Sequence, residues 1–282
     1  MQGTEIGYIC PPKMTNDDFA RISSFIFKEC GIKMPAVKKV MLESRLQKRL
    51  KALNYGSFKE YADFVLVKDK HHEEIILMID AVTTNKTDFF READHFNYIS
   101  DQLYHEINQN RQKKYKIWCA GCSSGEEAYT IAVTFEEIGE KTVVDYNILA
   151  TDICMEVLQK GKTAIYSHDR IEHLPLILKK KYFLKNKDVS NNSVRIIPKI
   201  RSKVTFQRLN FMDDFYDVQG PFDIIFCRNV LIYFSKETQE NVINKLCTKL
   251  STGGYFFLGH SESITNMNVP LAQVKPTIFR KI

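Results

Sequence analysis

Residues 117–129 read IWCAGCSSGEEAY. The apolar start predicts a short buried strand, the small residues a tight loop, and the paired acids Glu126 and Glu127 the first turn of a helix. Small residues let the backbone approach a ligand closely, and ligands of open α/β sheets bind beyond the carboxyl ends of the strands. A phosphate-binding loop would offer bare N–H groups and a Lys instead of two carboxylates. We therefore expect a polar, adenosine-like ligand that is poor in phosphate.

The length and composition predict an ordinary globular protein. The 282 residues are enough for one large domain or two smaller ones, and 44% of them are hydrophobic. Residues 1–5 lack the basic start of a signal peptide, and no apolar run is long enough for membrane insertion. The net charge of +6 is modest, so charge alone does not indicate nucleic-acid binding.

The cysteines indicate a reducing compartment. There are seven of them, an odd number scattered along the chain, which is typical of free thiols in a cytoplasmic protein. Cys119 and Cys122 have C-x-x-C spacing, but no second pair of Cys or His at ligand spacing accompanies them. We therefore expect no metal site and interpret both residues as small members of a buried strand and its loop.

The pattern of the chain changes near residue 82. Before it, four helices are expected: from about Thr15 to Gly31, over 35–53, from Ser57, and over 71–82. They make a small all-α domain, residues 1–82, followed by a linker at 83–95.

Residues 96–282 are predicted to form an α/β domain. Short strand candidates alternate with helices, which implies a mostly parallel sheet covered on both faces. The candidates are 116–120, 146–151, 204–208, 222–227 and 255–258, with an antiparallel edge strand at 278–282. The region between Tyr166 and Leu209 breaks the alternation, and we expect a small β insertion at about 180–207.

Three groups of polar residues are candidates for the ligand site. Asp152 follows the second strand and is placed to bind ribose hydroxyls, although it could instead cap the following helix. Arg228 and Asn229 follow the fourth strand, where Arg228 either faces the crevice or pairs with a structural carboxylate. Residues 83–92 either line a cleft at the domain join or form a plain linker, and Tyr233 could be a core aromatic.

Five motifs, in order along the chain, resemble those of the CheR family of chemotaxis receptor methyltransferases. They are TNKTDFFRE at 84–92, SGEE at 124–127, ATDI at 150–153, FCRNVLIYF at 226–234 and GHSES at 259–263. One motif alone is suggestive, whereas five in series are specific and cover almost the whole chain. The family often has Pro where this chain has Ala128, a difference that removes no polar contact.

This resemblance implies a Rossmann-like class I S-adenosylmethionine (SAM) methyltransferase domain with a small inserted antiparallel β-subdomain, after an all-α N-terminal domain. It implies a cytoplasmic protein-glutamate O-methyltransferase that moves a methyl group from SAM to receptor glutamates and releases S-adenosylhomocysteine. The implied partners are the cytoplasmic helices of methyl-accepting chemotaxis receptors, with a receptor C-terminal peptide as a further partner of the β-subdomain. We expect a monomer that binds no nucleic acid.

The matching motifs also imply roles for individual residues. Arg91 and Tyr233 are the expected catalytic residues, with Tyr233 near the transferred methyl group. The implied cofactor contacts are Asn85, Thr87, Arg91, Glu127, Asp152, Asn210, Phe211, Arg228 and Asn229. The resemblance leaves open whether Glu126 or Glu127 is the contacting acid.

The residues suggest how the acceptor is used. A glutamate is already an anion at pH 7, with a pKa near ~4.3, so it can attack the methyl group without a general base. Catalysis then depends on positioning and on exclusion of water. The basic helix at 33–51 is either a solvated face or a docking surface for acidic receptor helices, formed by Lys38, Arg45, Lys48 and Arg49.

Two other functions remain possible on the sequence alone. The first is a SAM-dependent methyltransferase of another protein or of nucleic acid, which would bind RNA or DNA with strong salt dependence. The second is a module that senses SAM without turnover.

Overall fold

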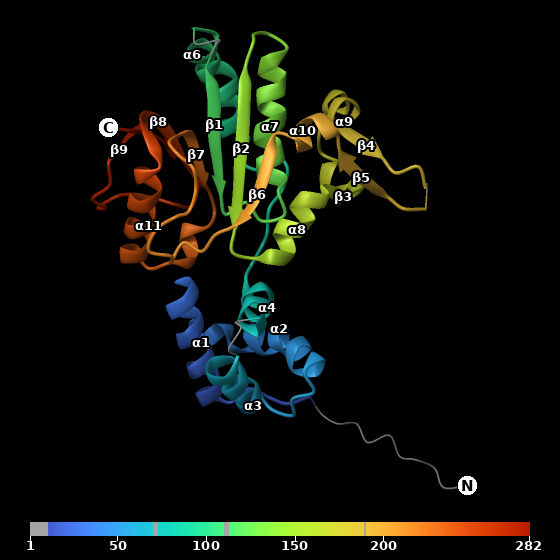
Figure 1. Ribbon diagram of the computed structural model, residues 1–282, viewed down its shortest axis with the longest axis vertical. Coiled ribbons are helices and arrows are strands. Elements are labelled where there is room, and N and C mark those ends of the chain that lie inside the picture. Colours follow the sequence, from blue (N-terminus) through green and yellow to red (C-terminus); the bar gives the residue numbers. More distant parts are fainter. Residues whose placement is uncertain (1–10, 70–72, 110–112, 189) are drawn as a thin grey trace. The chain divides into compact units, whose positions relative to one another are not determined.

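The computed structural model describes residues 11–69, 73–109, 113–188 and 190–282 (Figure 1). They fall into two compact units, divided between Thr83 and Thr84. The expectation about a signal peptide concerns residues 1–5, outside the described residues. Among the helices that are described, none has the length and apolar character needed to cross a membrane.

The first unit is all-helical, as predicted. Thr15 begins its first helix through a capping box, because its hydroxyl accepts the Asp18 N–H and the Asp18 carboxylate accepts the Thr15 N–H. The elements are α1 (Asn16–Cys30), η1 (Ala36–Lys38), α2 (Lys39–Ala52), α3 (Phe58–Asp63), η2 (Phe64–Lys68) and α4 (Glu73–Val82). The helix expected from 35 thus opens with a 3-10 turn, and the start expected for the last helix, at 71–72, lies outside the described residues.

The second unit contains a seven-stranded sheet. Its strands are β1 (Lys114–Ala120), β2 (Asp145–Asp152), β6 (Val204–Arg208), β7 (Phe222–Cys227), β8 (Leu250–Leu258), β9 (Leu271–Lys275) and β10 (Ile278–Lys281). The order is β6-β2-β1-β7-β8-β10-β9, in which the first five strands are parallel and β10 runs antiparallel to both of its neighbours. The predicted antiparallel strand at 278–282 is present, but β9 rather than this strand lies at the edge.

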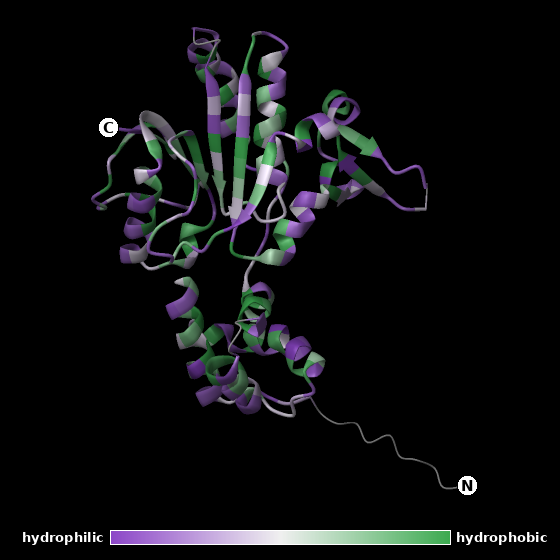
Figure 2. Cartoon of the chain, in the orientation of Figure 1, coloured by the Kyte–Doolittle hydropathy of each residue, from purple (hydrophilic) through white to green (hydrophobic). Residues whose placement is uncertain are grey.

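Both faces of the central strands are covered. Four successive residues of β1, Ile117 to Ala120, are fully buried, and successive side chains of a strand point to opposite faces. Figure 2 shows the same trend along β1, with hydrophilic residues at its start and hydrophobic ones toward its carboxyl end. The helices of this unit include α5 (Asp94–Tyr98), α6 (Tyr104–Gln109), α7 (Glu126–Gly139), α8 (Met155–Thr163) and α11 (Lys236–Thr248), with η3 (Ile99–Leu103) and η5 (Leu231–Tyr233).

The small inserted sheet is antiparallel, as expected, but its limits differ from 180–207. It consists of β3 (Ile165–Ser167), β4 (Phe183–Lys185) and β5 (Ser193–Ile196) in the order β3-β5-β4, with η4 (His168–Ile171), α9 (Leu176–Tyr182) and α10 (Pro198–Arg201) nearby in sequence (Figure 1). Residues 204–208 instead pair with β2 in the large sheet. The three residues of β3 are too few to show a period, and the alternation of Val204 and Phe206 fits either sheet.

Candidate active site

The loop after β1 is tightly folded against the end of β2. Gly121, Ser123 and Gly125 all have positive φ, and a Cβ on Gly121 would lie 2.3 Å from Val230 Cγ2. The Ser123 N–H donates to Asp152 Oδ2 at 2.8 Å. Only a loop of small residues can take this path, which agrees with the prediction from its sequence.

Asp152 joins two loops at the carboxyl edge of the sheet. Besides Ser123, it accepts the N–H of Cys154, the residue that precedes α8, at 3.0 Å. This contact is an Asx turn that fixes the chain before α8; it does not cap the free N–H groups of the helix, and ribose binding remains a prediction. The turn and ribose binding are compatible, because a carboxylate has about four acceptor positions.

The paired acids have different partners. Glu126 is 2% exposed, and its carboxylate accepts Arg170 Nη2 at 2.6 Å and Ser124 Oγ at 2.7 Å. Glu127 Oε2 lies 3.0 Å from Arg228 Nη1, and burial raises the pKa of Glu127 against the opposing charge of Arg228. Glu126 therefore pairs with Arg170 in η4, the segment after β3. Glu127 instead belongs to a polar cluster around Arg228 at the carboxyl ends of the strands.

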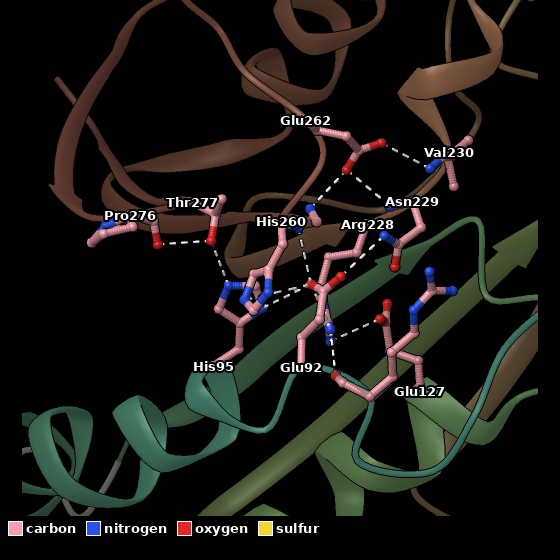
Figure 3. Close-up of polar contacts among 12 residues, drawn as sticks. Glu92, His95, Glu127, Arg228, Asn229, Val230, His260, Glu262, Pro276 and Thr277 are labelled. Carbon is pink, nitrogen blue, oxygen red and sulfur yellow. Dashed lines mark hydrogen bonds and ion pairs between the residues drawn. The ribbon is translucent and has the colours of Figure 1, made fainter.

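Arg228 is the centre of that cluster (Figure 3). Its side chain is fully buried and lies between two carboxylates, Glu127 and Glu92, with Nη2 3.1 Å from Glu92 Oε2. The guanidinium also packs over the Phe96 ring, 5.3 Å from its centroid. Of the two roles expected for Arg228, the structure shows the pairing with carboxylates. A contact between Arg228 and the cofactor remains a prediction.

Glu92 is held from three sides, although sequence reasoning gave it no role. Its carboxylate accepts Asn229 Nδ2 at 3.1 Å, Arg228 Nη2, and the His260 N–H at 3.2 Å. Burial alone would raise the pKa of Glu92, but the hydrogen bond from Asn229 and the charge of Arg228 outweigh it and hold the pKa below its ordinary value. Phe90, Glu92 and Asn229 all have φ between 55° and 59°, so this cluster contains strained backbone.

Glu262 is a second residue whose role the sequence did not reveal. Its carboxylate accepts four backbone N–H groups, from Gly259 and from residues 229, 230 and 231, at 2.7–2.9 Å. Figure 3 shows Glu262 beside Asn229 and Val230. Burial raises the pKa of Glu262, and the four N–H groups oppose that effect. Glu262 therefore fixes the chain that follows Arg228. The only signal for it was an acid inside the GHSES motif.

The predicted residues of 83–95 lie mainly in the second unit, which begins at Thr84. Asn85 is linked to the loop after β1, because its carbonyl accepts Ser123 Oγ at 2.9 Å. Thr87 is buried and its carbonyl accepts from Arg170, whereas Arg91 is partly exposed and donates to the Lys86 carbonyl at 3.1 Å. The structure thus brings Asn85 beside the loop that Asp152 holds.

Three predicted residues lie on the segments after β6 and β7. The side chain of Asn210 accepts the Met212 N–H at 3.0 Å. The ring of Phe211 packs on Phe234, with centroids 6.2 Å apart. Tyr233 is partly exposed in η5, so it is not the core aromatic of the alternative interpretation.

The two thiols of the C-x-x-C pair are buried. Burial raises the pKa of both Cys119 and Cys122, so neither is a thiolate at neutral pH. Cys119 donates to Glu127 Oε1 at 3.2 Å.

The basic helix of the first unit uses two of its four predicted residues internally. Arg49 forms a double hydrogen bond with the buried Glu74, at 2.9 and 2.6 Å, and Arg45 donates to the carbonyls of Val82 and Thr83. Arg49 therefore holds α2 against the first turn of α4, and Arg45 holds it against the C-terminal end of α4. Lys48 is exposed and Lys38 is partly exposed.

Comparison with known proteins agrees with this geometry. Residues 85–279 match the family described as "CheR methyltransferase, SAM binding domain", and residues 17–83 match "CheR methyltransferase, all-alpha domain". The fold and the loops at its strand ends thus define a SAM-dependent methyltransferase.

Three similar proteins are all named "Chemotaxis protein methyltransferase". The one from Borreliella burgdorferi is 37% identical and covers 95% of each chain. Those from Klebsiella aerogenes and Escherichia coli K12 are 36% and 34% identical over 90% of this chain, and over 86% and 87% of their own lengths. This chain belongs to the CheR methyltransferase family.

Proposed function

We propose that this protein transfers the methyl group of SAM to glutamate side chains of chemoreceptors in the cytoplasm, forming glutamyl methyl esters for chemotactic adaptation. The match of both family domains, in order from residue 17 to 279, carries the proposal. The relatives that share this arrangement along nearly their whole length are named as chemotaxis protein methyltransferases.

The charge of the strand ends fits SAM. Glu127 and Glu92 flank the buried Arg228, Asp152 ends β2 and holds the loop after β1, and that loop contains no lysine. This balance suits a sulfonium cation with ribose hydroxyls and disfavours a pyrophosphate. Two buried nitrogens of Arg228, Nε and Nη1, also lack a well-directed hydrogen bond among the described residues, which suits a carboxylate ligand.

We assign the site residues as follows, as proposals. Asn85, Thr87, Arg91, Glu127, Asp152, Asn210, Phe211, Arg228 and Asn229 hold the cofactor, and Tyr233 lies near the transferred methyl group. Bound SAM supplies an electrophilic methyl group on a positively charged sulfur. The acceptor carboxylate is ionised at pH 7, so the protein needs only to orient it and exclude water, with Arg91 as the orienting cation.

The receptor is proposed to dock on the exposed part of the basic helix. Arg45 and Arg49 hydrogen-bond to α4 and the residue after it, whereas Lys48 is exposed and Lys38 lies between two exposed apolar residues, so these two lysines are the proposed docking residues. Two valines at the start of the helix, Val37 and Val40, are 86% and 76% exposed and add an apolar surface.

A double change of Lys38 and Lys48 to Glu tests this docking. It should raise KM for the receptor fragment and leave SAM affinity unchanged, because all the proposed cofactor residues belong to the second unit and none to this helix. Lys28→Glu, an exposed lysine of α1, is the matched control. Equal loss of SAM affinity and receptor methylation would contradict the docking role.

The small sheet is the proposed site for a receptor C-terminal peptide. β3 and β4 lie at its edges, and an extended peptide can add to such an edge as a further strand. Fluorescence anisotropy with labelled C-terminal receptor peptides measures this directly. Absence of saturable binding would remove the peptide from the list of partners.

Transfer of tritium from labelled SAM to cytoplasmic receptor fragments tests the function itself. We expect label on the receptor that alkali releases as methanol, as a carboxyl methyl ester requires. Alkali-stable label would indicate another kind of acceptor group, and SAM binding without any transfer would indicate a sensing module.

A further inference from the structure

A Glu and two His side chains converge beside the cofactor cluster. His95 Nδ1 lies 3.9 Å and His260 Nε2 lies 4.0 Å from the same oxygen, Glu92 Oε2. The three ligand-type atoms all lie within 4.8 Å of one another (Figure 3). The His260 backbone N–H donates to this same oxygen, but no hydrogen bond joins either imidazole nitrogen to the carboxylate among the described residues.

The tautomer of His95 can be inferred from its other nitrogen. The Thr277 hydroxyl donates to the Pro276 carbonyl at 2.7 Å, so toward His95 Nε2, also 2.7 Å away, it can only accept. His95 therefore carries its proton on Nε2 and presents a bare lone pair at Nδ1. That lone pair faces the carboxylate of Glu92, which is also an acceptor.

This Nδ1 atom is buried and unpartnered. His95 is 1% exposed, and Nδ1 has no hydrogen-bond partner among the described residues. Two acceptors that face each other need a shared donor or a cation between them. An imidazole that donates its far N–H to an oxygen while its near nitrogen stays bare is typical of metal-ligating histidines.

An entry path reaches the cluster from outside. A pocket of about 310 Å³ is lined by both histidines and by residues of α5, of η3 and of the turn before β10. His260 is 52% exposed on its side chain, so it can close on an ion by a small rotation. The two acids at the pocket wall, Asp94 and Asp101, favour a cation, and Lys275 opposes it.

Nearby charge sets how tightly an ion can bind. Arg228 Nη2 shares Glu92 Oε2 and would repel a cation, while Glu127 on the far side of Arg228 attracts one. The ion therefore competes with the Arg228–Glu92 pair, and binding should be of modest affinity.

We propose that Glu92, His95 and His260 form a binding site for a divalent transition metal ion such as Zn²⁺, which prefers imidazole and carboxylate ligands. Binding draws Glu92 away from Arg228 and Asn229, and so disturbs the cofactor cluster. The ion is an inhibitor of this protein. The inhibition rests on the proposed function, whereas the binding does not.

Calorimetric titration of the untagged, metal-free full chain with ZnCl₂ tests the binding. We expect one ion per chain, an affinity at least about tenfold weaker in His260→Ala, and no change in the control His105→Ala, an exposed histidine of α6. Thr277→Val should weaken binding and Thr277→Ser should retain it, because only the hydroxyl accepts from His95. Circular dichroism checks that each variant is folded.

A second titration separates binding from function. Zn²⁺ should lower SAM affinity in the wild-type chain and much less so in His260→Ala. No saturable binding of Zn²⁺, or equal binding by His260→Ala, would overturn the site and indicate only a water molecule between Glu92 and His95. Metal binding without any effect on SAM would overturn the inhibition alone.

Discussion

The substitution Glu262→Gln tests whether one carboxylate holds the chain after β7. Oε1 accepts the N–H groups of Val230 and Leu231, and Oε2 accepts those of Asn229 and Gly259. Glutamine keeps one acceptor oxygen and turns an NH₂ group toward the other pair. In either orientation, two of the four hydrogen bonds are lost.

The expected loss of stability follows from those two bonds. Each buried donor left without a partner costs about 1–3 kcal/mol, which gives about 2–6 kcal/mol in total. A neutral amide is easier to bury than a carboxylate, and burial raises the pKa of Glu262. Because this difference offsets part of the loss, we expect Glu262→Gln to lower the free energy of unfolding by about 2–3 kcal/mol. Because the released N–H groups belong to Asn229 or to residues close to it, and Arg228 precedes them, SAM affinity should fall as well.

Urea unfolding and SAM titration of the same samples measure the two effects. Glu172→Gln, at an exposed glutamate, is the matched control and should leave both values unchanged. If Glu262→Gln unfolds within about 0.5 kcal/mol of the wild type and binds SAM equally well, the reasoning is wrong.

Three further changes have defined outcomes. Arg49→Met should cost about 2 kcal/mol in urea unfolding, because it leaves the buried Glu74 unpaired, although Arg49 itself is partly exposed. Gly121→Ala should cost at least about 2 kcal/mol, since φ is +85° and the new Cβ meets Val230. The folded pKa of Glu92 is lowered, so its ionisation stabilises the fold at neutral pH and this contribution is lost as pH falls through that pKa. The difference in unfolding free energy between wild type and Glu92→Gln should therefore shrink below about pH 4.5.

Each of these changes has a control of the same type. Lys51→Met alters an exposed cation of the same helix as Arg49 and should be nearly neutral. Gly56→Ala adds a Cβ whose nearest neighbour is 3.7 Å away and should also be nearly neutral. For the pH series, Glu172→Gln should give a flat difference. If Lys51→Met or Gly56→Ala loses as much unfolding free energy as its test variant, the argument for that test variant is wrong. A difference for Glu92→Gln that does not change with pH would contradict the argument about the Glu92 pKa.

The sequence predicted what depends on local pattern. The alternation of strands and helices gave the parallel sheet, and the loop of small residues at 121–125 folds at positive φ, where glycine is favoured. Such features are decided by neighbouring residues, so they can be recognised without knowledge of the tertiary structure.

Contacts between distant residues were not predictable in this way. Arg228 and Glu92 are 136 positions apart, and nothing in either segment identifies the other as its partner. The spacing of Arg45 and Arg49 indicated one helix face but not that α4 packs against it, so two structural arginines were expected to dock a receptor. The role of Glu262 likewise depends on a loop that precedes it by some thirty residues.

The left-handed residues of the site bear on how this protein can evolve. Phe90, Glu92, Ser123 and Asn229 each adopt a left-handed conformation in which glycine would cost less, by about 1 kcal/mol or more at the first three and by less at Asn229, because asparagine tolerates this region. At Asn229, glycine would relieve that strain and at the same time remove the amide that holds Glu92. Selection for heat resistance alone should therefore erode these positions early, whereas selection for turnover should preserve them. Thermostable variants of this enzyme are best sought elsewhere in the chain.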